Sequence, residues 1–81
     1  MSFTRTFHDQ EIGQICVMRS ENDDGLPECR IYFEPPELGV CSMAYGFDAD
    51  EEGFDKRDQF FENLSSKQVV DCILAIPGIW D

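Results

Sequence analysis

The segment from Cys29 to Glu34 alternates apolar and polar residues, and this alternation predicts a strand with one buried face. Cys29, Ile31 and Phe33 fall on the same side of an extended chain. Pro35-Pro36 follows directly and ends the strand, because neither proline can donate a backbone hydrogen bond to a ladder. A half-buried strand needs neighbours, so this pattern restricts the chain to folds that contain a sheet with a covered face.

Two further segments carry strand signals. Ile15 to Arg19 is rich in residues that favour strands, and Val40 to Phe47 places its larger side chains on one face and its small ones on the other. The acidic turn Glu21 to Gly25 separates the first two strands. Short connections favour antiparallel pairing, so we expect a three-stranded meander in sequence order.

Two helices are expected after the strands. The first runs from about Phe54 or Asp55 to Asn63 and has an apolar stripe. The second begins at Ser65, which forms an S-x-x-Q capping box with Gln68, and it continues to about Ala75. The sequence therefore predicts one compact acidic α+β domain over residues 1–81, β-β-β-α-α, with two short helices packed on one face of a three-stranded antiparallel sheet. Ile79 and Trp80 are expected to close the core.

Composition restricts the environment and the ligands. The chain has 81 residues, with 17 Asp and Glu against 6 Lys and Arg, and a net charge of -11. No apolar run approaches the roughly 18 residues of a membrane span, and the first residues do not form a signal peptide, so we expect a cytoplasmic protein without membrane contact. Direct binding of nucleic acid is disfavoured, because phosphates require Lys and Arg.

Catalytic and metal-binding motifs are not found. No C-x-x-C motif occurs among the four cysteines, Cys16, Cys29, Cys41 and Cys72. His8 is the single histidine, so the residues that a structural zinc site needs are not present at a suitable spacing. We expect small buried cysteines in a reducing compartment, with a two-disulfide framework as the alternative. The chain has no glycine-rich phosphate loop and no G-x-S-x-G motif, so it is predicted to be a non-enzyme without a cofactor.

Ten carboxylates are candidates for binding a partner. In a meander, the turn after the first predicted strand and the exit from the third lie at the same end of the sheet, so the acidic residues of both segments converge. We call eight of them the acidic rim: Glu21, Asp23, Asp24, Asp48, Asp50, Glu51, Glu52 and Asp55. Two more, four positions apart on the first predicted helix, extend this surface: Asp58 and Glu62.

Three interpretations of this charge compete. It is a solvated surface that aids solubility, a ligand for the basic nucleic-acid-binding surface of another protein, or a weak calcium loop. Residues 48–53 match the first, third and sixth positions of a calcium loop, but Gln59 occupies the twelfth, where a bidentate Glu is required. We favour the second interpretation, in which carboxylates compete with nucleic acid for Lys and Arg groups.

In its size, its charge and its acidic segments 21–24 and 48–58, the chain resembles the small anti-CRISPR proteins of bacteriophages and mobile elements, particularly those that mimic DNA. The resemblance is one of overall character. It implies a monomeric, stoichiometric inhibitor that occupies the DNA-binding surface of a CRISPR effector complex in the host cytoplasm. The alternative is a small regulatory or antitoxin-like module that binds its partner through an apolar face containing Tyr32, Ile79 or Trp80.

Overall fold

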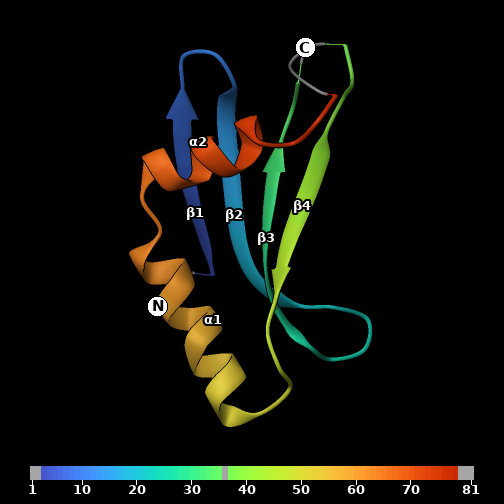
Figure 1. Ribbon diagram of the computed structural model, residues 1–81, viewed down its shortest axis with the longest axis vertical. Coiled ribbons are helices and arrows are strands. Elements are labelled where there is room, and N and C mark those ends of the chain that lie inside the picture. Colours follow the sequence, from blue (N-terminus) through green and yellow to red (C-terminus); the bar gives the residue numbers. More distant parts are fainter. Residues whose placement is uncertain (1–2, 36, 79–81) are drawn as a thin grey trace.

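Four strands precede two helices in the computed structural model, which describes residues 3–35 and 37–78. The elements are β1 Thr4–Asp9, β2 Gly13–Glu21, β3 Pro27–Phe33, β4 Cys41–Gly46, α1 Glu51–Asn63 and α2 Ser66–Leu74. The strands form one antiparallel sheet in the order β1-β2-β3-β4, and both helices lie across the same face of it (Figure 1). The predicted α+β class is confirmed, whereas the predicted number of strands is wrong.

The strand that the sequence analysis missed is β1. It pairs antiparallel with β2, from Thr4 opposite Met18 to Asp9 opposite Gly13. Phe7 is the only large apolar residue of this edge strand, so its hydrophobic pattern is weak. His8 therefore lies exposed in an edge strand of the sheet. The other three strands lie where the alternation and the turn residues placed them, within about two residues at each end.

The core lies between the helices and the covered face of the sheet. Side chains of β2 and β3 at odd-numbered positions point toward the helices, where α1 and α2 add their own apolar stripes. The fully buried core consists of Ile12, Ile15, Val17, Cys29, Ile31, Phe33, Phe61, Leu64, Val69 and Ile73. Ile79 and Trp80, which were expected to close this core, lie outside the described residues.

Both helices begin at capped residues. The side chain of Asp50 accepts a hydrogen bond from the backbone N–H of Gly53 at 2.6 Å, so α1 starts at Glu51, about three residues before the predicted position. The predicted capping box of α2 is confirmed: the Ser65 hydroxyl accepts from the Gln68 N–H at 3.2 Å, and the Ser65 N–H donates to the Gln68 side chain at 2.8 Å.

Three arginines attach α1 to the sheet. Arg5 of β1 donates to the backbone oxygens of Phe61 and Leu64, at 2.8 and 2.7 Å, and so satisfies carbonyls that the end of α1 leaves unpaired. Arg57 of α1 donates to the backbone oxygen of Ser20 at 2.9 Å. Arg19 of β2 is the third, and it forms an ion pair with Asp58 of α1. The helix is thereby fixed in position above β2 and β3.

Candidate acidic interface

The two acidic segments of the rim lie at the same end of the sheet, as the meander predicted. The β2–β3 loop and the connection from β4 to α1 lie together at the lower end of the molecule in Figure 1. A backbone hydrogen bond of 2.9 Å from the Phe47 N–H to the Pro27 oxygen joins the two segments just beyond the last paired residues. The expected convergence therefore follows from strand order and register.

The β2–β3 loop is held in a defined shape by Asn22. Its side-chain oxygen accepts hydrogen bonds from the backbone N–H groups of Asp24 and Leu26, both at 2.9 Å. Gly25 has a φ of 81° and supplies the left-handed backbone that the turn requires. Asp23 and Asp24 are exposed at the tip of this turn, so their carboxylates are presented from a structured loop.

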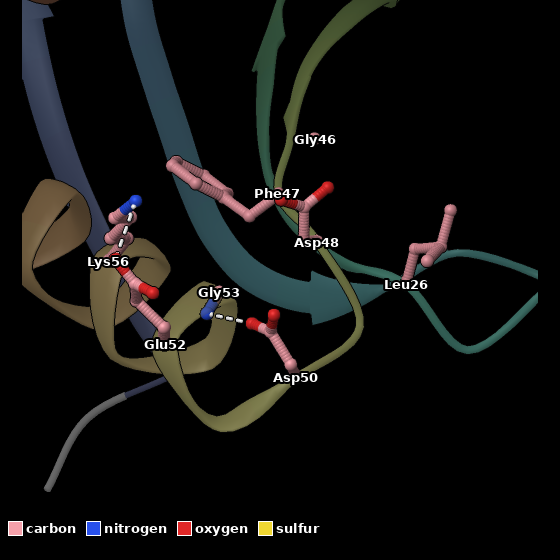
Figure 2. Close-up of a pocket in the computed structure, with 8 residues that line it drawn as sticks. All are labelled: Leu26, Gly46, Phe47, Asp48, Asp50, Glu52, Gly53 and Lys56. Carbon is pink, nitrogen blue, oxygen red and sulfur yellow. Dashed lines mark hydrogen bonds and ion pairs between the residues drawn. The ribbon is translucent and has the colours of Figure 1, made fainter.

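A hollow of about 360 Å³ lies between the β2–β3 loop and the start of α1. Figure 2 shows Leu26 from the loop on one side and Asp48, Asp50 and Glu52 on the other. Lys56 also borders the hollow, but its ammonium group binds Glu52 at 3.0 Å, and this contact raises the pKa of the lysine. The carboxylates at this hollow outnumber its one cation, so the hollow is suited to a positively charged group.

The ten candidate carboxylates differ in how they are used within the molecule. Glu52 is paired with Lys56, and Asp50 caps α1. The remaining rim residues are exposed and form no ion pair within the described parts of the chain: Glu21, Asp23, Asp24, Asp48, Glu51 and Asp55. Glu62 is also exposed, but it lies near the far end of α1, about 16 Å along the helix axis from Glu51.

Asp58 has an internal role. Its carboxylate binds Arg19 at 3.2 Å and Arg57 at 3.0 Å. The Arg19 side chain is only 4% exposed and lies against the rings of Phe3 and Phe61, whereas the Asp58 side chain is 36% exposed. Asp58 thus supplies the counter-charge for Arg19 beneath α1 and for Arg57 of α1 itself, which is a structural use that the sequence analysis did not foresee.

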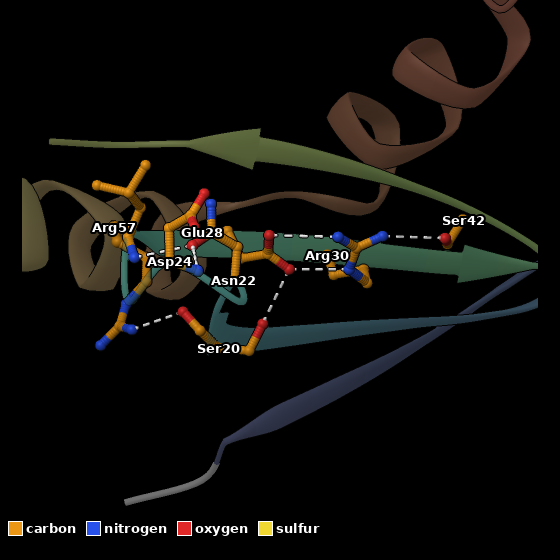
Figure 3. Close-up of polar contacts among 8 residues, drawn as sticks. Ser20, Asn22, Asp24, Glu28, Arg30, Ser42 and Arg57 are labelled. Atoms are coloured by element: carbon orange, nitrogen blue, oxygen red, sulfur yellow. Dashed lines mark hydrogen bonds and ion pairs between the residues drawn. The ribbon is translucent and has the colours of Figure 1, made fainter. Parts of the chain in front are cut away.

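Each of the six Lys and Arg side chains makes an internal polar contact. Arg30 forms a two-point contact with Glu28 on the uncovered face of the sheet, at 2.8 and 3.2 Å, while Ser20 donates to the same carboxylate (Figure 3). These hydrogen bonds, those of Arg30 first, hold the pKa of Glu28 below its ordinary value. The engaged side chains are Arg5, Arg19, Arg30, Lys56, Arg57 and Lys67. Within the described residues, no Lys or Arg side chain is therefore left free to neutralise the rim.

Sequence reasoning missed Arg19 as a partner of the acidic surface. A signal for Arg19 was present, because it continues the buried alternation of Ile15 and Val17 along β2. A charged side chain on a buried face needs a counter-charge, and a carboxylate had to come from the covering layer. The alternation could not identify which carboxylate of α1 would supply it.

The segment 48–59 does not form a calcium loop in the structure. Helix α1 begins at Glu51, so most of the twelve positions of such a loop are helical. Asp50, the third position, directs its side chain to the Gly53 N–H. Among residues 3–35 and 37–78, no group of three or more His, Cys, Asp or Glu side chains is arranged to hold a metal ion.

The four cysteines are free thiols. Cys29 is buried beneath α1, and burial raises the pKa of its thiol to about 11. Cys16, Cys41 and Cys72 are half-buried, so full burial was expected correctly for only one of the four. A hydrogen bond to Cys72, together with burial, raises the pKa of Tyr45 to about 12.

Comparison with known proteins gives no relative. No family model matches the chain, and no curated protein or solved structure is significantly similar to it. Over the described residues, neither helix is long and apolar enough to span a membrane.

Proposed function

We propose that this protein is a stoichiometric inhibitor that binds the basic, nucleic-acid-binding surface of another protein through its acidic rim. It acts as a competitor of nucleic acid, without catalysis. The observation that carries the proposal is the unequal use of charge: all six cations are consumed by internal contacts, whereas most rim carboxylates are exposed and unpaired. The described Lys and Arg side chains therefore supply no counter-charge to these unpaired carboxylates, which leaves them available to the cations of a partner.

The rim is also rigidly presented, which favours a binding role over a purely solubilising one. Asn22 fixes the β2–β3 loop, and the Asp50 cap fixes the start of α1. The Phe47–Pro27 hydrogen bond connects the two segments. A surface that serves solubility alone needs no such order, whereas competition with the regular charges of a nucleic acid is strengthened when the carboxylates are preorganised.

The most specific partner class is a CRISPR effector complex, which the resemblance to acidic anti-CRISPR proteins implies. The inhibitor would act as a monomer in the cytoplasm of the host and would occupy the groove that holds target DNA. The proposal makes electrostatic attraction central to recognition. Binding should therefore weaken as salt rises from about 0.1 to 1 M, over which the Debye length falls from about 10 to 3 Å.

The test compares three variants that each remove three negative charges. The rim variant is Asp48→Asn, Glu51→Gln and Asp55→Asn, and the loop variant is Glu21→Gln, Asp23→Asn and Asp24→Asn. The matched control changes three exposed carboxylates near the opposite end of the sheet: Glu11→Gln, Glu34→Gln and Glu37→Gln. None of these nine side chains forms an ion pair in the described structure or supplies a helix cap.

The assay measures displacement of labelled target DNA from a purified effector complex by each variant. We expect the rim and loop variants to inhibit at least about tenfold less well, a loss of about 1.4 kcal/mol, and the control to match the unchanged protein. If the rim, loop and control variants all lost inhibition to the same extent, the net charge of the protein would be responsible and not the position of the rim carboxylates. If the rim variant and the loop variant each inhibited as well as the unchanged protein, the proposal would be refuted.

A further inference from the structure

The outer edge of β4 is free within the described residues, where this strand pairs only with β3. The hydrogen bond from the Phe47 N–H to the Pro27 oxygen fixes the phase of the antiparallel ladder. Every second residue of β4, counted back from Phe47, directs its backbone N–H and C=O groups toward β3. The residues between them direct these groups outward, away from the sheet. Those outward residues are Ser42, Ala44 and Gly46, all of which are exposed.

This edge lacks the devices that usually prevent strands from pairing. The sequence Cys41–Gly46 contains no charged residue and no proline, and its ladder with β3 has no bulge. The opposite edge of the sheet, β1, has Arg5, His8 and Asp9 in a strand of equal length. The side chains of β4 next to its outward backbone groups are small, so an approaching chain meets little obstruction. The asymmetry identifies β4 as the edge that can accept a further strand.

A second hollow of about 360 Å³ lies on the helix side, where β4 ends. Its lining includes Phe47, Phe60 and Leu64, together with four polar residues: Lys56, Gln59, Asn63 and Gln68. The ring of Phe60 lies 5.9 Å from that of Phe47 and 5.3 Å from that of Tyr45, measured between centroids. Aromatic and leucine side chains at this position offer apolar surface to a side chain from outside.

The second hollow adjoins the acidic one. Phe47 and Lys56 line both hollows, and Figure 2 shows these two side chains in the acidic one, with Lys56 paired to Glu52. Both hollows include Phe47, the residue that follows β4, so a chain that pairs with the end of this strand lies next to aromatic side chains and to carboxylates. The negative charge of the acidic hollow favours a basic occupant. It disfavours a second copy of this protein, whose net charge is -11.

We propose that the partner contributes an extended basic segment, which pairs with the free edge of β4 as an additional strand. One apolar side chain of that segment occupies the hollow at Phe47 and Phe60, and a Lys or Arg side chain occupies the hollow at Asp48 and Asp50. Backbone hydrogen bonds supply affinity, and the two hollows supply specificity. This inference rests on the proposed function, because it assumes a basic partner.

The test uses the peptide acetyl-Lys-Thr-Val-Thr-Lys-amide, whose Val and Lys side chains project from the same face of a strand, and a form of it in which every central backbone amide is N-methylated. Both carry the same charge, but only the first can pair as a strand. The protein variant Ala44→Pro removes an N–H group that points outward from β4 without removing a hydrogen bond to β3. Thr6→Pro is its matched control on β1, because Thr6 has the same outward phase on the other edge.

Binding is measured by chemical-shift titration of the ¹⁵N-labelled protein at low salt. We expect the unmethylated peptide to bind the unchanged protein and Thr6→Pro alike, with the largest shifts between residues 42 and 48. Ala44→Pro and peptide methylation should each raise Kd by about tenfold, as expected for loss of one to two backbone hydrogen bonds. If Ala44→Pro fails to fold, the methylated peptide decides the same question.

Other results would overturn the inference in distinguishable ways. Equal binding of both peptides would mean that attraction is electrostatic only, which refutes strand addition and leaves the proposed function standing. Unchanged peptide binding by the variant Asp48→Asn, Glu51→Gln, Asp55→Asn would show that the Lys side chain does not enter the hollow at Asp48, which refutes this inference, whereas the proposed function is refuted only by full inhibition from both triple variants in the DNA-displacement assay. Slow hydrogen exchange at the Ala44 amide of the free protein, or a dimer that Ala44→Pro dissociates, would show that this chain already occupies the edge.

Discussion

Replacement of Asp58 by Asn should destabilise the fold by about 2–3 kcal/mol. The substitution removes the counter-charge of Arg19 and Arg57, whose side chains are only 4% and 12% exposed. Removal of one partner from a buried ion pair costs about 3–5 kcal/mol, because the remaining charge is left uncompensated. Asp58 is 36% exposed, so water replaces part of the lost interaction and reduces the expected cost.

The measurement is thermal and urea unfolding followed by circular dichroism. For a domain of this size each kcal/mol lowers Tm by about 4–8 °C, so Asp58→Asn should unfold about 8–24 °C earlier than the unchanged protein. Asp55→Asn is the matched control, because Asp55 lies on the same helix, is exposed and forms no ion pair in the described structure. Its Tm should change by no more than about 3 °C.

The reasoning would be refuted if Asp58→Asn unfolded within about 3 °C of the control, since surface substitutions produce effects of that size. The same experiment separates two uses of charge on one helix. Asp58→Asn would weaken binding to a partner by destabilising the fold, whereas Asp55→Asn would weaken the binding of the folded protein. A DNA-displacement assay below the Tm of both variants therefore gives the two residues different signatures.

Three further predictions concern the helix starts and the uncovered face. Gly53→Ala should destabilise the fold by at least about 2 kcal/mol, because the added Cβ would collide with the backbone oxygen of Asp48. Ser65→Ala should cost about 1 kcal/mol through loss of the α2 cap. Glu28, whose pKa is lowered by Arg30, stabilises the fold above its ordinary pKa of 4.5, and this stabilisation is lost as the pH falls through the lower folded-state value. The free energy of unfolding of Glu28→Gln should thus fall less steeply with acid.

Each of these predictions has a control and an opposing outcome. Gly46→Ala adds a Cβ that meets no atom within 4 Å, and equal stability of the two alanine variants would contradict the collision argument. Ser66→Ala changes a neighbouring serine that does not supply the cap, and it should leave Tm unchanged. For Glu28, parallel pH profiles of the variant and the unchanged protein between pH 3 and 6, measured by urea unfolding, would show that its pairing contributes nothing.

The sequence predicted elements wherever local chemistry determined them. The alternation around Ile31 located β3, and the Ser65 capping box located α2 to within a residue. Antiparallel order and the convergence of the two acidic segments followed from short connections. β1 was missed because an edge strand held mainly by its ladder and by Arg5 needs little apolar patterning. The internal use of Asp58 depends on which face of α1 meets Arg19, and this is a tertiary property.

The order of the sheet also has a consequence for how the molecule folds. Each strand pairs with the next one along the chain, so the three ladders close short loops and lose little chain entropy. Contacts between distant parts of the chain include those of Arg5 with the end of α1, across 56 and 59 residues, and those of α2 with β1. We therefore expect the meander to assemble first and rapidly. The docking of α1 on the sheet, through the contacts of the three arginines, is then the late event. The meander alone brings the β2–β3 loop and Asp48 to the same end of the sheet, and the docking of α1 then adds Glu51, Glu52 and Asp55, so the acidic surface is complete only with the complete fold.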